Sequence, residues 1–389
     1  MLKLFTKKYY EVLIVVGIFL VALMQHGFVL NMLGLPDQGD SFVTLFLLKH
    51  VGMSFPFDGW ETLPYFAEQS GNLFWTEHHL GQSLMFLVIE SMVGDLIVSF
   101  NVTIILITAL NFFTAYWGIK KISGDMVYAS IAALLIAFMP YLLHYRAHLH
   151  LYAIFPTVIC MTVLFTDKHE LQLSKIFMSG AVQFLFSITL GLFLVLIFFL
   201  TLPLIGKNFL ALYSKKNWLQ IFSSTTGVLA IGVSVVAMSL LYQYYLTGAE
   251  RGFERAVSDA VPFSFDISSI FSFFGVMVEP QNHVDFQLNY SLFITVVVIF
   301  LLLEKRLDRL VLVLCVSLAF GPYMIFDKQQ TDLTLPYYWL YEFLPFMQAL
   351  RAPVRLVIVV NLVAFFLLAS RGRNIGLGLG GLGAPVIVF

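Results

Sequence analysis

Charged residues are scarce in this chain, and their scarcity excludes an ordinary soluble protein. Only 12% of its 389 residues are Asp, Glu, Lys or Arg, whereas soluble domains carry about 25%. Hydrophobic residues make up 59% of the chain, and 40 residues are Phe. With a mean hydropathy of +0.88, this composition predicts a polytopic membrane protein. The net charge of −1 gives no reason to expect nucleic acid as a partner.

Cysteine and the familiar catalytic motifs are also scarce or absent. The two cysteines, Cys160 and Cys315, fall inside apolar runs, so we expect buried small hydrophobes with no disulfide and no metal site. The sequence has no Walker phosphate loop, no zinc-type Cys/His spacing and no G-x-S-x-G elbow. The glycine-rich tail Gly376–Gly383 contains a G-x-G-x-x-G string, but no strand precedes it and no helix follows, which excludes a dinucleotide site.

Long apolar runs are what the chain has in abundance, and a span needs roughly 20 such residues. The basic start Met1–Tyr10 resembles a signal peptide, but the run Val12–Leu33 can span and no cleavage site follows it. We therefore expect an all-α membrane protein: a helical bundle of about 10–11 spans forming a single transmembrane domain over 1–389, with a C-terminus that looks truncated. The predicted spans are 11–33, 96–119, 126–143, 150–166, 176–188, 190–206, 218–246, 289–303, 309–326 and 354–370, with a partial eleventh from 375.

The run 176–206 is too long for one ordinary span. Gln183, Ser187, Thr189 and Gly191 interrupt its apolar character, and we expect two helices that meet at this point.

The distribution of Lys and Arg predicts the orientation. With the N-terminus inside, the inner segments hold fifteen of these residues and the outer segments hold seven, which accounts for all 22. Cytoplasmic loops carry such an excess. We therefore expect a multi-pass membrane protein with a cytoplasmic N-terminus. The long loops 34–82, 247–288 and 327–353 then lie outside, which puts the working face on the periplasmic or extracellular side.

The first outer loop carries the strongest candidates for chemistry. Asp37 and Asp40 follow Pro36 and flank Gly39 where the first span emerges. A carboxylate in a half-dry cavity can act as a general base. The alternative is that Asp40, or Ser41, caps a short interfacial helix predicted over Ser41–Val51. A similar helix is predicted over Ser83–Val93.

Two further clusters of polar residues lie in the predicted outer turns. Glu77, His78 and His79 form the first cluster, in which a histidine would bind an anionic headgroup or help Asp40 to coordinate a divalent ion (Mg or Mn). The alternative is capping of the next helix. Arg146 and His148 form a phosphate-binding cluster, or else part of an interfacial belt. On one helix, His144 and His148 would share a face.

Two outer arginines, Arg351 and Arg355, flank Pro353 at the mouth of the last full span. The positive-inside bias does not account for them, whereas a bidentate grip on a lipid phosphate would. The alternative is a pair of salt bridges to outer carboxylates such as Glu342 or Asp332. No cofactor is certain from the sequence.

These pieces occur in an order that resembles bacterial multi-span proteins of the GT-C glycosyltransferase fold. The elements are Gly39-Asp40, Asn72-Leu73-Phe74-Trp75, Glu77-His78-His79-Leu80-Gly81, the turn His148–His150 before Pro156, Ser264–Ile267, Gly321-Pro322 and Arg351–Arg355. The resemblance covers about residues 11–371.

The resemblance implies an inverting glycosyltransferase that takes a sugar from a polyprenyl-phosphate donor on the outer face. It makes Asp40 the expected base, with Asp37 in reserve, and Arg351, Arg355 and His148 the groups that neutralise the phosphate leaving group. The partners would be the lipid-linked donor, membrane lipid and a glycan, lipid or protein acceptor of the cell envelope. The alternatives are a non-enzymatic lipid or polysaccharide transporter, or an accessory membrane scaffold subunit. Few ionisable residues fall within the predicted spans, which counts against ion-coupled transport.

Overall fold

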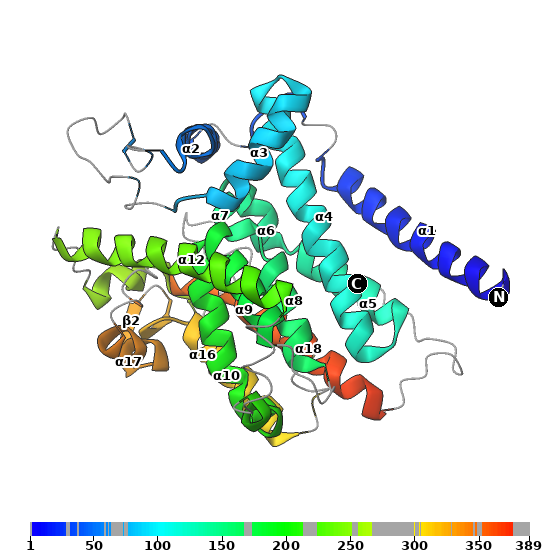
Figure 1. Cartoon of the computed structure of the whole chain (residues 1–389). Helices are drawn as coiled ribbons and strands as arrows, with labels where there is room; N and C mark the ends of the chain where they lie inside the picture. The colour runs from blue at the N-terminus through cyan, green and yellow to red at the C-terminus, as the bar shows by residue number, and fades with distance from the viewer. Residues whose placement is uncertain are drawn as a thin grey trace.

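The computed structural model is mostly helical (Figure 1). It describes residues 2–28, 32–36, 39–57, 60, 62–63, 73, 77–166, 173–212, 224–250, 256–266, 299, 303, 305–327, 329–344, 347 and 352–375. The helices are α1 (Leu2–Gln25), α2 (Asp40–Ser54), α3 (Leu80–Val93), α4 (Leu96–Ser123), α5 (Met126–Ala137), α6 (Pro140–His144), α7 (Leu149–Tyr152), α8 (Phe155–Phe165), α9 (Leu173–Phe186), α10 (Ile188–Leu212), α12 (Thr225–Glu250), α16 (Arg306–Ala319), α17 (Pro336–Phe343) and α18 (Val357–Ile375). Short 3₁₀ turns are η3 (Tyr145–Ala147), η4 (Val257–Phe263) and η6 (Pro353–Leu356), and strands β1 (Tyr323–Phe326) and β2 (Gln329–Thr334) form a hairpin.

Three apolar helical segments of the described chain are long enough to cross a membrane. They are Leu96–Ser123, Met126–Leu143 and Pro353–Arg371. Five shorter apolar helices accompany them: Tyr9–Gln25, Leu80–Val93, Leu149–Phe165, Ile188–Leu204 and Gly227–Gln243. A protein with membrane-length apolar helices is therefore supported, whereas the full count of 10–11 spans stays a prediction. The predicted span 289–303 lies almost wholly outside the described residues, as does the tail from 376.

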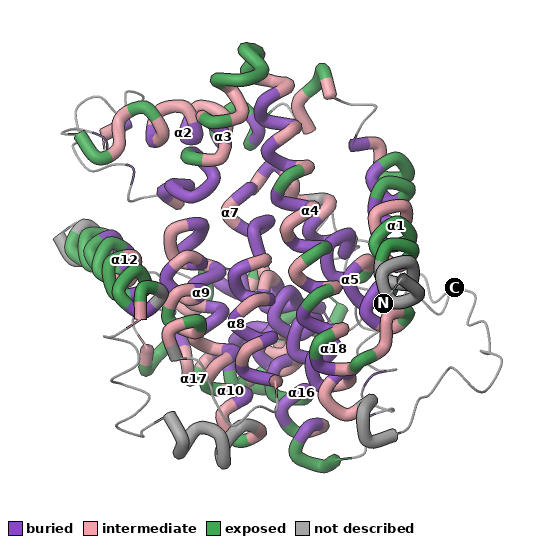
Figure 2. The backbone as a smooth tube through the Cα atoms, turned by 45° about the vertical axis from the view of Figure 1, so that its right-hand side comes forward, coloured by how far each residue is buried: buried purple, intermediate pink, exposed green. Residues whose placement is uncertain are grey.

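The core lies around α18, which Figure 2 shows as buried among its neighbours, while α1 and α12 expose one face at the periphery. α4 packs against α5, α8 and α18. A Cβ on Gly118 would lie 2.0 Å from Thr162 Oγ1, so only glycine permits α4 and α8 to approach this closely. The Tyr128 hydroxyl donates to the Phe365 carbonyl at 3.0 Å and joins α5 to α18.

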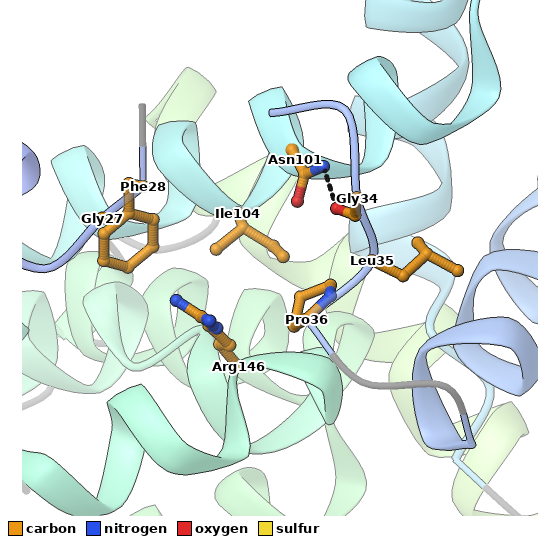
Figure 3. A pocket seen from close by; sticks show the side chains of 8 residues that line it. All are labelled: Gly27, Phe28, Gly34, Leu35, Pro36, Asn101, Ile104 and Arg146. Carbon is orange, nitrogen blue, oxygen red and sulfur yellow. Dashed lines mark hydrogen bonds between the residues drawn. The ribbon is translucent and has the colours of Figure 1, made fainter. Parts of the chain in front are cut away.

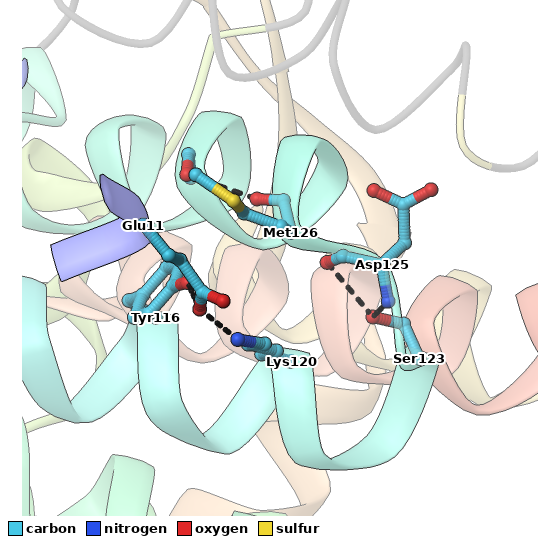
Figure 4. Close-up of polar contacts among 7 residues, drawn as sticks. Glu11, Tyr116, Lys120, Ser123, Asp125 and Met126 are labelled. Atoms are coloured by element: carbon cyan, nitrogen blue, oxygen red, sulfur yellow. Dashed lines mark hydrogen bonds and ion pairs between the residues drawn. The ribbon is translucent and has the colours of Figure 1, made fainter. Parts of the chain in front are cut away.

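Polar contacts fix the end of α4 (Figure 4). Gly124 ends the helix in the left-handed conformation at φ 77°, and the Asp125 N–H donates to the Ser123 hydroxyl at 3.2 Å, as Figure 4 shows. The Asp125 carboxylate accepts from the Tyr128 N–H at 2.9 Å and begins α5. Glu11 of α1 pairs with Lys120 of α4 and accepts a hydrogen bond from Tyr116. The peripheral helix α1 is therefore tied to the bundle by a carboxylate as well as by packing.

Two predicted spans extend several residues past the C-terminal end of the helix. The helix predicted over 11–33 ends at Gln25, because Gly27 takes φ 70° and the Phe28 N–H reaches back to the Leu23 carbonyl. The helix predicted over 309–326 covers Arg306–Ala319 instead.

The end of α16 has a physical cause. Gly321 takes φ 93°, Pro322 has no N–H, and the following Tyr323–Phe326 pairs antiparallel with Gln329–Thr334. The all-α prediction therefore missed this β hairpin, which lies among the helices of the described residues.

The predicted break in the run 176–206 is confirmed. α9 ends at Phe186 and α10 begins at Ile188, with Ser187 between them. The Ser187 hydroxyl accepts from the Leu190 N–H at 3.1 Å and caps α10. The helices predicted over Ser41–Val51 and Ser83–Val93 are also present as α2 and α3, and the Lys49–Glu90 ion pair joins them.

Candidate functional site

Asp40 is the first residue of α2. The N-cap is Gly39, whereas the alternative drawn from the sequence made Asp40 or Ser41 the cap. A carboxylate in the first turn is stabilised by the positive end of the helix dipole. The Asp40 side chain is 61% exposed, so a reacting group can reach it.

The turn between α5 and α8 brings His148 to Asp40. Pro140 begins α6, and the chain then passes through η3 and α7, so His144 and His148 do not share one helix as the spacing suggested. Buried Asn111 holds the turn by donating to the Tyr152 carbonyl at 2.7 Å and accepting from the Ile154 N–H at 3.1 Å. His148 Nε2 lies 2.9 Å from Asp40 Oδ2. Two predicted site residues are therefore in direct contact.

A column of three imidazoles runs inward from Asp40. The rings of His148 and His150 cross edge to face with centroids 5.6 Å apart, and His150 and His79 do the same at 5.4 Å. His79 is 2% exposed and takes the left-handed conformation at φ 51°. The Nδ1 atoms of His79 and His150 are buried without a hydrogen-bond partner among the described residues. Burial lowers the pKa of His79 to about 3, with His78 and His148 adding to the effect, so its ring is neutral.

Glu77 closes the break between α9 and α10. Its carboxylate accepts from the N–H groups of Ile188 at 2.8 Å and Thr189 at 2.9 Å, and from the Ser187 hydroxyl at 3.3 Å. These N–H groups belong to the first turn of α10, where the helix itself provides no carbonyl acceptor. Burial raises the pKa of Glu77, and these hydrogen bonds act in the opposite direction. Glu77 therefore caps α10, whereas the sequence suggested that it would cap the next helix in the chain.

His78 is fully buried and bonded on both ring nitrogens. The Leu80 N–H donates to Nδ1 at 3.0 Å, so Nε2 carries the proton and donates to the Phe184 carbonyl at 2.9 Å. Burial lowers the pKa of His78 to about 4. A neutral ring with both nitrogens engaged joins the start of α3 to the end of α9.

Arg146 lines a pocket of about 220 Å³ between the end of α1, the segment before α2 and α4 (Figure 3). Its guanidinium lies 5.7 Å from the centroid of the Phe28 ring. Within the described residues it forms no ion pair. Asn101 shapes the opposite wall by donating to the carbonyls of Met32 at 2.9 Å and Gly34 at 2.8 Å. The pocket therefore presents one positive group in a partly apolar enclosure, which suits an anion attached to an apolar group.

Arg355 lies in η6, at the start of the α18 segment, and its positive charge acts on the His150 ring. Among the described residues it forms no ion pair with Asp332, Glu342 or any other carboxylate. Asp37 and Arg351 lie outside the described residues. The described part of the chain also contains no group of three or more His, Cys, Asp or Glu placed to hold a metal ion. The described geometry gives no specific place for a divalent cation.

Sequence reasoning missed several residues of this region. His79 and His150 belong to the motifs named from the sequence, but neither was chosen as a site residue. Asn101 and Asn111 are two amides inside the apolar helix α4, and a buried amide normally has a bonding partner. The sequence could therefore have indicated that Asn101 is hydrogen-bonded. It could not have identified the acceptors, which are the carbonyls of Met32 and Gly34.

No family model matches the chain, and no curated protein or solved structure shows a significant match to it.

Proposed function

We propose that the chain is a membrane glycosyltransferase that moves a sugar from a polyprenyl-phosphate donor to a cell-envelope acceptor on the outer face of a bacterial plasma membrane. The single observation that carries this proposal is the 2.9 Å contact of Asp40 with His148. The contact holds the largely exposed Asp40 carboxylate against His148, and His148 follows Arg146, the positive group of the pocket, by two residues.

Asp40 is the base in this proposal. The His148 Nε2–H donates to Asp40 Oδ2 and leaves Oδ1 for the acceptor hydroxyl. As the hydroxyl oxygen bonds to the anomeric carbon, its proton passes to Asp40, and the bond from that carbon to the phosphate oxygen breaks with its electron pair going to the phosphate. The configuration inverts because the hydroxyl attacks the face opposite the phosphate.

Arg146 receives the phosphate leaving group. Its guanidinium lines the pocket, and no carboxylate among the described residues neutralises it. A fixed cation at this place would stabilise the negative charge that develops on the phosphate. Arg351 and Arg355 are further candidates for this role. Glu77 and His78, whose described bonds are to the protein, shape the wall of the site next to the imidazole column.

The test is transfer by the purified chain in lipid nanodiscs. Polyprenyl-phosphate-linked ¹⁴C-hexoses are supplied with cell-envelope extract as acceptor, and labelled product is counted. Asp40→Asn should lower transfer by about 10²–10⁴-fold, the usual contribution of a general base. The matched control is Asp332→Asn, which removes an exposed carboxylate on β2 and should leave transfer unchanged.

Full transfer by Asp40→Asn would remove Asp40 from the mechanism. A wild-type chain that binds the donors but transfers none of them would favour the alternative, a lipid transporter or scaffold. Donor binding is measured separately by the shift in thermal unfolding temperature on adding polyprenyl phosphate, with Arg146→Gln as the variant expected to lose the shift.

A further inference from the structure

One side of α17 and the adjoining hairpin exposes a continuous row of aromatic rings. Tyr323 and Tyr338 have centroids 5.5 Å apart, Tyr338 and Trp339 5.3 Å, and Trp339 and Phe343 6.1 Å with planes only 14° apart. We call these four residues the aromatic ridge. Trp339 is 53% exposed and Phe343 is 73% exposed.

The opposite side of α17 is anchored in the protein. Tyr337 and Tyr341 are buried, and the Tyr341 hydroxyl donates to the Ala256 carbonyl at 3.3 Å. α17 also packs against α16. The buried side of α17 therefore fixes the position of the aromatic ridge and keeps its rings on the surface.

The hairpin beside the ridge adds further apolar surface. Phe326 and Leu333 are about half exposed. Several exposed large apolar side chains on one element are unusual where a protein faces water and indicate contact with a membrane or another molecule.

The depth of the ridge follows from the charged pair at the far end of α16. Arg371 of α18 donates two hydrogen bonds to the buried Asp308 carboxylate, at 2.6 and 2.8 Å. This pair marks one end of both helices, and a charged pair is costly at the bilayer centre. The 14 residues of α16 rise only about 21 Å, less than the roughly 30 Å of a hydrocarbon core. With the charged pair toward one boundary, the C-terminal end of α16 and α17 packed against it therefore lie in the opposite half of the bilayer, close to its boundary layer.

We propose that the aromatic ridge lies in the interfacial layer of the bilayer, with Trp339 and Phe343 among the upper acyl chains and headgroups. Trp and Tyr concentrate at this depth because their rings are apolar and their N–H and O–H groups find polar partners there. The polar strand Gln329–Thr334 of the hairpin faces the water side. In this proposal α17 contacts lipid at the interface between bilayer and water. The proposal does not depend on the proposed transfer reaction.

The test uses tryptophan fluorescence in phosphatidylcholine vesicles whose acyl chains carry bromine at carbons 6 and 7 or at carbons 11 and 12. Subtracting the signal of Trp339→Phe from that of the wild type isolates Trp339. Bromine at the shallow position should reduce this component at least twofold, and more strongly than bromine at the deep position. Aqueous iodide should have little effect on it.

The control is Trp117→Phe, which removes a half-exposed tryptophan from the membrane-length helix α4. It should remove a component that brominated chains also quench, which verifies that the quencher reaches the protein. A Trp339 component that iodide quenches and brominated lipid does not would overturn the proposal. So would a Trp339 component that responds only to added soluble oligosaccharide, because that result identifies the ridge as a sugar platform.

Discussion

His148 Nε2 and Asp40 Oδ2 lie 2.9 Å apart and join the start of α2 to the turn before α7. The two residues are far apart in the sequence, so the contact depends on how α2 packs beside this turn. The contact leaves most of the Asp40 carboxylate exposed while fixing its orientation, which is the arrangement a general base needs.

Replacing His148 should affect transfer more than stability. His148→Phe removes the donor to Asp40 and should lower transfer by roughly 10- to 100-fold, because a misplaced catalytic group loses about that much. His148→Gln retains a donor and should lose less. The unfolding temperature should change little in both variants, because an exposed ion pair contributes at most about 1 kcal/mol. Unchanged transfer in His148→Phe would rule out a positioning role.

Replacing Glu77 should affect stability more than transfer. Glu77→Ala leaves the Ile188 and Thr189 N–H groups without their acceptor and should destabilise the fold by roughly 2–4 kcal/mol. Glu77→Gln keeps one acceptor oxygen and should cost less. Denaturant unfolding in detergent, followed by near-ultraviolet circular dichroism, measures the difference. Equal stability of Glu77→Ala and wild type would show that the cap is not needed.

Acid should destabilise the protein through His78. Its pKa is about 4 in the fold and about 6.5 when unfolded, so between these values the unfolded chain binds more protons than the folded one. Stability is therefore complete above pH 6.5 and falls as the pH drops toward 4. His78→Gln should flatten this part of the stability–pH curve. Since His79 titrates lower, at about 3, some acid sensitivity should persist. The same slope in wild type and variant would contradict the assignment.

Breaking the Asp308–Arg371 pair should be costly. Asp308 is fully buried, so Asp308→Ala leaves the Arg371 cation without its bidentate partner and should destabilise by about 3–5 kcal/mol. The double variant Asp308→Leu with Arg371→Leu should recover much of this loss. Thermal unfolding of four proteins, the wild type, Asp308→Leu, Arg371→Leu and the double variant, measures the coupling. A double variant as unstable as the sum of the single ones would show that the two residues act separately.

Much of the fold could be predicted from patterns along the chain. The apolar runs gave α4, the α5–α6 segment and α18, because a membrane-length run has few alternatives to a helix. The polar interruption at Ser187 predicted the break between α9 and α10, since serine caps a helix with its own hydroxyl. The buried state of Cys160 and Cys315 followed from their apolar neighbours.

The helix boundaries were less predictable where glycine ended an apolar run. Hydropathy alone extended the first span to residue 33 and the ninth to 326. Backbone conformation decided otherwise, with Gly27 at φ 70° and Gly321 at φ 93°. An apolar residue contributes the same hydropathy to a helix and to a strand, which is why Tyr323–Phe326 was assigned to the wrong element.

The sequence by itself therefore determined the class of protein, the main apolar helices and the identity of the polar residues near their ends. Only the tertiary structure decided which of those residues meet. Asp40 reaches His148, whereas Glu77 and His78, close by in sequence, turn to α10 and α9 instead. The physical reason is that a buried polar group must find a partner wherever packing places one, and that partner usually lies on a distant segment.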